Sequence, residues 1–236
     1  MSFVLPGNQI QVKSANVVLG PNVDIAPGSI NETVLTPTTA GMLKVKKANP
    51  QSSLYYVESN TKRYVPQIND FVIGVLFGAF GEYFRISLNS FSPPVLLNQY
   101  SFPNASKKNR PRLSNGDLVY ARVSAVERNV DVELSCIDAT TGKEGGFGVL
   151  SDGLVFDVKL AFARYLLFNS DAEIFTQLVK RCKFEIAIGV NGRIWIKTDD
   201  IKTTIACVNV IRNSQNWTKE ELPAKIEDTF KVLKTN

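Results

Sequence analysis

The chain has 236 residues, of which 44% are hydrophobic and 21% are charged, so it has a folded protein's composition and room for one large domain or several small ones. Its net charge of +5 permits nucleic acid as a partner without requiring it. Histidine is absent, which excludes Ser–His–Asp catalysis, Cys–His catalysis and mixed Cys/His zinc sites within the chain.

The three cysteines, Cys136, Cys182 and Cys207, lie far apart and form no CxxC pair. Their apolar surroundings predict buried or half-buried free thiols in a reducing compartment. The first residues lack a signal peptide's basic start and apolar run, and no apolar stretch is long enough to span a membrane. We therefore expect a soluble intracellular protein with no membrane partner.

Residues 1–65 read as an N-terminal β domain of short strands between turns. Leu5-Pro6-Gly7, Gly20-Pro21-Asn22 and Pro27-Gly28-Ser29 are turn signals, and Met42–Val45 and Leu54–Val57 are candidate strands. A sheet this small needs a neighbour to pack against.

Residues 66–150 contain five short runs of strand character. These runs are Phe71–Leu76, Tyr83–Leu88, Val95–Leu97, Leu118–Val123 and Val130–Cys136. A closed antiparallel barrel removes exposed strand edges, and the OB-type barrel has five strands. The sequence therefore predicts a five-stranded OB-type RNA-binding barrel.

Residues 151–236 change to a mixed pattern with helical period. The expected order is strand Leu154–Val158, helices Ala161–Phe168 and Ala172–Cys182, strands Phe184–Ile188 and Arg193–Lys197, and a helix after Asp199-Asp200. The second helix carries an apolar stripe made of Ile174, Phe175, Leu178 and Val179. The helix after Asp199-Asp200 has apolar residues at helical spacing, namely Ile201, Ile205, Val208 and Ile211.

This β-α-α-β-β-α order predicts a KH-type α/β domain. A C-terminal helix follows Thr218–Glu221, which fits a capping box, with Leu222, Ile226, Phe230 and Leu233 at helical spacing. The fold class is therefore a multi-module, β-rich α+β protein.

The loop between the third and fourth barrel strands carries Lys107, Lys108, Arg110 and Arg112 within six residues. Cations gain from counterion release on a nucleic-acid backbone, so RNA contact is one interpretation. Docking on an acidic neighbouring subunit and simple solvation are the alternatives.

Aromatic residues are frequent in the barrel, and OB barrels stack bases on such rings. The alternative is that the rings fill the core. Phe80 and Tyr83 flank a glycine-containing turn, so we expect this pair to be exposed and to contact RNA.

The segment Gly189-Val190-Asn191-Gly192 resembles a GxxG clamp, but it lies between two strands instead of two helices. Asn-Gly between strands signals a tight hairpin in which both turn residues favour positive φ. We therefore expect a structural KH hairpin of Gly189, Asn191 and Gly192, packed on the barrel, with Trp195 between the modules and not stacked on a base.

The acid pairs Asp199-Asp200 and Glu220-Glu221 stand where helices begin, which favours capping over metal binding. A metal-dependent nuclease needs several converging carboxylates, and the sequence offers no such cluster. We therefore expect no metal, no cofactor and no catalytic residue.

Several motifs together resemble a known family. They are Arg63–Pro66, Asp70–Gly74, Ser101–Pro111, Gly116–Arg122 and Gly189–Lys197. Their order and spacing resemble the cap subunits of the RNA exosome, in particular the fungal form of the ribosomal RNA-processing protein forty family. Asn8 and Asn69 depart from the family pattern, where Asp and Gly are frequent, and both look like turn variants.

The resemblance implies the same three modules and a non-catalytic cap subunit. Such subunits sit on a ring of ribonuclease-PH-like proteins with other cap subunits, and they guide single-stranded RNA into the central channel for 3′–5′ processing and decay. It also implies a hetero-oligomer found in nucleus, nucleolus and cytoplasm. The alternatives are a free-standing RNA-binding factor in translation or ribosome assembly, and a nuclease, which the missing histidines and carboxylate cluster disfavour.

Overall fold

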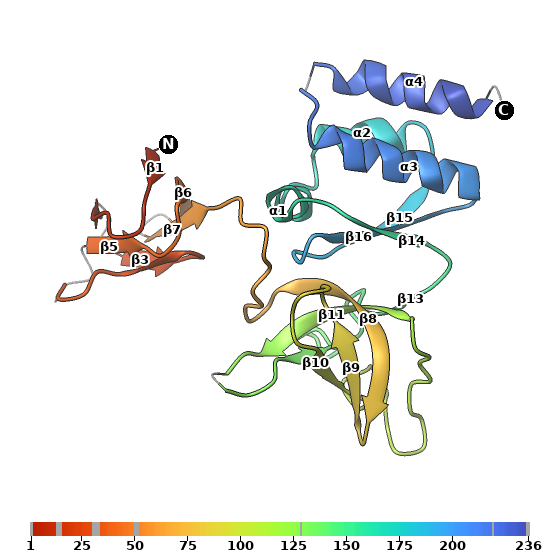
Figure 1. Ribbon diagram of the computed structural model, residues 1–236, viewed down its shortest axis with the longest axis horizontal. Helices are drawn as coiled ribbons and strands as arrows, with labels where there is room; N and C mark the ends of the chain where they lie inside the picture. The colour runs from red at the N-terminus through yellow and green to blue at the C-terminus, as the bar shows by residue number, and fades with distance from the viewer. Residues whose placement is uncertain are drawn as a thin grey trace. The chain divides into compact units, whose positions relative to one another are not determined.

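The computed structural model describes residues 2–12, 16–29, 34–49, 52–127, 129–218 and 220–234. The chain divides into two compact units, residues 1–61 and 62–236, whose elements are drawn in Figure 1. The first unit ends at Thr61, close to the predicted end of the N-terminal domain. The predicted barrel and KH module together form the second unit.

The first unit consists of two small sheets. Its strands are β1 (Ser2–Val4), β2 (Ile10–Gln11), β3 (Asn16–Leu19), β4 (Val23–Ile25), β5 (Val34–Pro37), β6 (Gly41–Asn49) and β7 (Ser52–Glu58). They form one sheet in the order β1-β6-β7-β3 and another in the order β2-β5-β4. Buried Val4 and Val57 of one sheet share a core with Leu35 of the other, so each sheet has the packing neighbour that its size demands.

The second unit begins with the barrel. Its strands are β8 (Phe71–Phe80), β9 (Tyr83–Ser87), β10 (Val95–Asn98), β11 (Leu118–Ala125) and β12 (Glu133–Ser135), followed by β13 (Gly148–Leu150). Antiparallel pairing joins β9 to β8 and β10, and β11 to β8. β12 pairs with β11 and, in parallel, with β10, which closes the predicted five-stranded barrel.

The predicted fifth strand, Val130–Cys136, is too long, because only Glu133–Ser135 has strand structure. Asn129 just before it has a φ of 67°, which places a turn where the strand was expected to start.

The rest of the second unit is the KH module. Its elements are β14 (Leu154–Asp157), α1 (Leu160–Phe168), α2 (Glu173–Val179), β15 (Phe184–Ile188), β16 (Arg193–Thr198), α3 (Ile201–Ser214) and α4 (Leu222–Lys234). The sheet order is β14-β16-β15, and α3 contacts β14, β16 and α4 (Figure 1). The predicted KH order is therefore confirmed.

Two predicted helical stripes are wrong in part. In α2, Ile174 and Leu178 are buried but Val179 is 67% exposed. In α3, Val208 and Ile211 are buried but Ile201 is 76% exposed and Ile205 is also exposed. In the first turn of α3 the inward position belongs to Thr204, whose hydroxyl lies 2.7 Å from that of Thr198 and donates to the Asp200 carbonyl.

Candidate nucleic-acid interface

The hairpin between β8 and β9 presents the two predicted aromatic side chains. Phe80 and Tyr83 are directly opposite each other in the strand register, so they lie on the same face. The turn between them is closed by Gly81, which has a φ of 59°. Phe80 is 77% exposed and Tyr83 is half-buried, so Phe80 is available to a ligand and Tyr83 partly so.

The loop between β10 and β11 contains the four predicted cations, Lys107, Lys108, Arg110 and Arg112, and all four are exposed. Its tip is a compact turn in which the backbone N–H groups of Ser106 and Asn109 each donate to the other residue's carbonyl at 3.0 Å. On either side of that tip, the loop is held by Ala105 and Leu113, which pack against the barrel core.

A tyrosine joins the basic loop to the hairpin. The Arg110 guanidinium lies over the Tyr100 ring, 5.8 Å from its centroid. The Tyr100 hydroxyl in turn donates to the Glu82 carboxylate at 3.3 Å, and the neighbouring Gln99 side chain donates to the Gly81 carbonyl. The two predicted regions, which are far apart in the chain, therefore share one side of the barrel.

The outward face of β9 adds a cation that sequence reasoning did not single out. Arg85 is exposed two residues after Tyr83, whereas Phe84 and Ile86 point into the core and are buried. The alternating pattern of Tyr83–Leu88 was the available signal, because period-2 alternation puts residues 83 and 85 on one face.

The remaining barrel aromatics divide between core and surface. Phe84 and Phe102 are buried and meet edge to face at 6.4 Å, whereas Phe77 and Phe91 are exposed. The alternative interpretation, that the rings fill the barrel core, therefore holds for Phe84 and Phe102. It does not hold for Phe80.

The glycine-containing segment forms the hairpin turn between β15 and β16. The Gly189 N–H donates to the Arg193 carbonyl at 2.8 Å, and the Gly192 N–H donates to the Gly189 carbonyl at 3.0 Å. Gly192 has a φ of 83°, but the expectation that Asn191 also has a positive φ is wrong. Hairpin turns longer than two residues need the left-handed conformation only at their last residue, which here is Gly192. Asn191 therefore has no need of a positive φ.

Close packing requires both glycines. A Cβ on Gly189 would lie 2.8 Å from the Ile73 nitrogen of the barrel, and one on Gly192 would lie 2.8 Å from the Val158 carbonyl oxygen. Neither glycine stands between helices, because α1 and α2 are joined by residues 169–172.

Asn191 attaches this hairpin to the barrel. Its Oδ1 accepts from the Ile73 N–H at 3.2 Å, and its Nδ2 donates to the carbonyls of Ile73 and Leu88 at 2.8 and 2.9 Å. Arg193 adds a bond from Nη1 to the Ser87 carbonyl at 2.8 Å. Burial lowers the pKa of this guanidinium, and the Asp157 carboxylate 3.8 Å away acts in the opposite direction.

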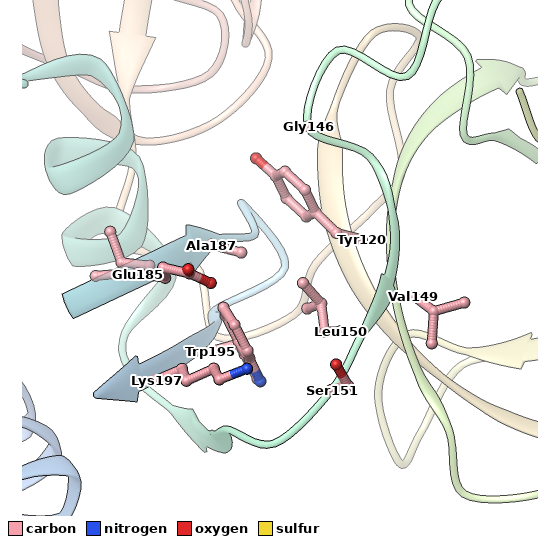
Figure 2. A pocket seen from close by; sticks show the side chains of 10 residues that line it. Tyr120, Gly146, Val149, Leu150, Ser151, Glu185, Ala187, Trp195 and Lys197 are labelled. Atoms are coloured by element: carbon pink, nitrogen blue, oxygen red, sulfur yellow. The ribbon is translucent and has the colours of Figure 1, made fainter. Parts of the chain in front are cut away.

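Trp195 lies between the two modules, where it was predicted to pack. It is 5% exposed and contacts Ile73 and Ala187, with Tyr120 and Leu150 beside it. Next to it a pocket of about 380 Å³ is open between β15, β16 and the segment of residues 149–151. Figure 2 shows Trp195 and Lys197 on the KH side of this pocket, opposite Leu150 and Ser151.

The acid pairs lie at helix starts. The Asp200 carboxylate accepts from the Thr203 N–H and caps α3, and the Glu221 carboxylate accepts from the Thr218 N–H ahead of α4. Within the part of the chain that the structure describes, no group of three or more acidic or cysteine side chains could hold a metal ion. No described helix is long and apolar enough to cross a membrane.

Family models match the chain in the order of its modules. Residues 17–63 match the Exosome complex exonuclease Rrp40 N-terminal domain, residues 64–148 match the S1 domain of Exosome complex component RRP40, and residues 153–202 match the KH domain. With the closed barrel and the KH sheet, these matches define a multi-module protein built from nucleic-acid-binding folds.

Similar proteins narrow this class to one family. Exosome complex component RRP40 of Saccharomyces cerevisiae is 44% identical over 212 residues, covering 89% of this chain and 87% of that protein. The Schizosaccharomyces pombe protein of that name is 34% identical over 238 residues (99% and 96%), and the Homo sapiens protein 36% over 190 residues (79% and 68%). The chain belongs to the RRP40 family of exosome complex components.

A crystal structure assigned to an exosome complex RNA-binding protein shares the fold. Its TM-score is 0.56 at 19% sequence identity, and the match covers 72% of this chain and 98% of that one.

Proposed function

We propose that this chain is a non-catalytic cap subunit of the RNA exosome, which stabilises the ring and helps to guide RNA into the central channel for 3′–5′ processing and decay. Membership of a family whose relatives are named exosome complex components supports the proposal. The same relatives disfavour the alternative of a free-standing factor in translation or ribosome assembly.

The proposed partners follow from the family resemblance. They are the ribonuclease-PH-like ring subunits, the other cap subunits and single-stranded RNA, in a hetero-oligomer. The proposed locations are nucleus, nucleolus and cytoplasm.

Two observations support the non-catalytic part of the proposal. The chain has no histidine, the residue most used for proton transfer in hydrolysis. One residue of each acidic pair, Asp200 and Glu221, accepts a backbone N–H at a helix start.

The observation that carries the proposed RNA contact is the link between cations and rings on one side of the barrel. Arg110 lies on Tyr100, which bonds to Glu82 in the turn between Phe80 and Tyr83. Single-stranded nucleic acid binds where cations meet phosphates and rings meet bases, and each stacked base contributes roughly 1–3 kcal/mol. We infer that the chain's RNA path crosses this face.

Replacing Lys107, Lys108, Arg110 and Arg112 with alanine tests this path. Titration of the purified chain with fluorescent poly(U) RNA across a salt series should show weaker binding and a shallower dependence on salt. The slope of log K against log salt should fall by about 0.7 for each phosphate that the variant no longer neutralises. Phe80→Ala should weaken binding with little change in that slope, because a ring releases no counterions.

The matched control removes four cations of the KH module, Lys180, Lys183, Lys202 and Lys231, with the same change in net charge. This control should leave RNA affinity near that of the wild type. Unchanged RNA affinity of the loop variant, together with its failure to assemble with ring subunits, would show that the loop docks on protein instead of RNA.

A further inference from the structure

Two of the three cysteines meet in the KH module although they stand 25 positions apart in the chain. Cys182 follows α2 and Cys207 lies in the middle of α3, and their Sγ atoms are 3.5 Å apart. Both are free thiols. A disulfide has an S–S length of about 2.05 Å, so the two sulfurs need to approach by roughly 1.5 Å, a distance within the reach of side-chain rotation.

The two thiols differ in access to solvent. Cys207 is fully buried in the KH core, whereas Cys182 is half-buried at its edge, with Sγ 3.7 Å from the Leu178 carbonyl oxygen. Burial, followed by the neighbouring Cys182, raises the pKa of the Cys207 thiol. A dissolved oxidant therefore meets Cys182 first, and Cys207 can react only through Cys182.

We propose that Cys182 and Cys207 are a peroxide-responsive dithiol that closes to a reversible disulfide inside the KH module. The Cys182 sulfur attacks one oxygen of hydrogen peroxide, the O–O bond breaks, and a sulfenic acid and one water form. The Cys207 sulfur then attacks the Cys182 sulfur, the S–O bond breaks, and the thiol proton leaves with the hydroxyl as a second water. Two thiols are oxidised by two electrons and one peroxide is reduced to two waters.

The position of the pair gives this reaction a structural effect. The covalent loop from residue 182 to 207 contains β15, β16 and the hairpin whose Asn191 bonds to the barrel. A crosslink restricts the unfolded chain more than the folded one. Oxidation therefore stabilises the KH module and the hairpin that joins it to the barrel.

The test treats the purified full chain with hydrogen peroxide and counts free thiols after denaturation. The wild type should lose two of its three thiols, give one linked peptide pair containing Cys182 and Cys207, and show a Tm higher by roughly 5–10 °C. Dithiothreitol should restore three thiols and the original Tm.

Variants separate the proposed route from general oxidation. Cys182→Ser, which replaces only the sulfur atom of a half-buried side chain, should keep both remaining thiols and show no rise in Tm. Cys136 is the internal control: it is buried in the barrel core, and burial raises its pKa to about 12. Three surviving thiols in the treated wild type, oxidised Cys182 without a link to Cys207, or a link that includes Cys136 would each overturn the proposal.

Discussion

Asn191 is a buried polar side chain, 7% exposed, whose hydrogen bonds all go to backbone groups of the barrel. A buried amide is stabilising only when its donors and acceptor are paired, and here one side chain pairs an N–H and two carbonyls of the barrel backbone. The side chain therefore substitutes for a short stretch of backbone pairing between β8 and the hairpin of β15 and β16.

Replacing Asn191 with alanine should destabilise the second unit strongly. The change removes the side-chain partner of the Ile73 N–H and of the carbonyls of Ile73 and Leu88, at a cost of about 2–4 kcal/mol in the free energy of unfolding. Urea denaturation followed by tryptophan fluorescence measures the loss. Asn213→Ala, at an exposed position of α3, is the control and should change stability by less than about 0.5 kcal/mol. A loss equal to the control's would contradict the role given to the amide.

Trp195 offers a second test at the residue scale, because its ring and its N–H contribute differently to the stability of the second unit. The Nε1 atom is buried and has no hydrogen-bond partner among the described residues. Trp195→Phe should therefore cost little, about 1–2 kcal/mol, since it deletes ring volume and an unpaired donor together. Trp195→Ala should cost about 3–5 kcal/mol. Thermal unfolding followed by circular dichroism compares the two, and equal losses would contradict the packing role given to the ring.

Among the elements, sequence periodicity predicted which segments are strands and helices, and it was less informative about which residues they bury. Period 3.6 groups Ile201 and Ile205 with Val208 and Ile211, but it cannot tell how the helix is rotated about its axis against the sheet. The buried side of α3 carries Thr204, Cys207, Val208 and Ile211, so Ile201 and Ile205 lie at its exposed margin.

The sequence predicted the separate regions of the candidate site, but it did not predict that they lie next to each other. Strand alternation and the glycine turn predicted an exposed Phe80, and charge clustering singled out the loop of residues 107–112. The link through Arg110, Tyr100 and Glu82 depends on how β10 pairs with β9, which places Gln99 beside the turn of the hairpin. No local pattern contains that information, because it arises from register between strands.

The start of α3 provides a test with a neighbouring control. Asp200 accepts from the Thr203 N–H at 3.2 Å, whereas Asp199 makes no cap bond to any residue that the structure describes, although both are exposed acids. Asp200→Ala should lower stability by about 1 kcal/mol, and Asp199→Ala should change it by about 0.3 kcal/mol at most. Because the two changes remove the same charge, the difference in urea midpoint isolates the cap hydrogen bond. Equal effects would instead assign the contribution to the helix dipole.

For the molecule as a whole, the second unit joins two modules that many proteins use separately. The barrel core includes Val190 and Leu160 of the KH module, and the hairpin of residues 189–192 bonds to β8 through backbone and side chain. A module pair with a shared core and buried, paired polar groups should unfold as one cooperative unit. The proposed path of RNA across the barrel depends on this property, because the barrel face keeps its orientation only while the KH module packed against it stays folded.

Hydrogen exchange measures whether the two modules unfold together. In the wild type the slowest amides of β8–β11 and of β14–β16 should exchange at the same free energy of opening, because both open only on global unfolding. The double variant Asn191→Ala, Arg193→Ala removes the bonds from the hairpin to Ile73, Leu88 and Ser87 and should separate the two values by more than about 1 kcal/mol. Two distinct values already present in the wild type would mean that the modules open independently. The orientation of the barrel face would then depend on the proposed neighbouring subunits and not on the KH module.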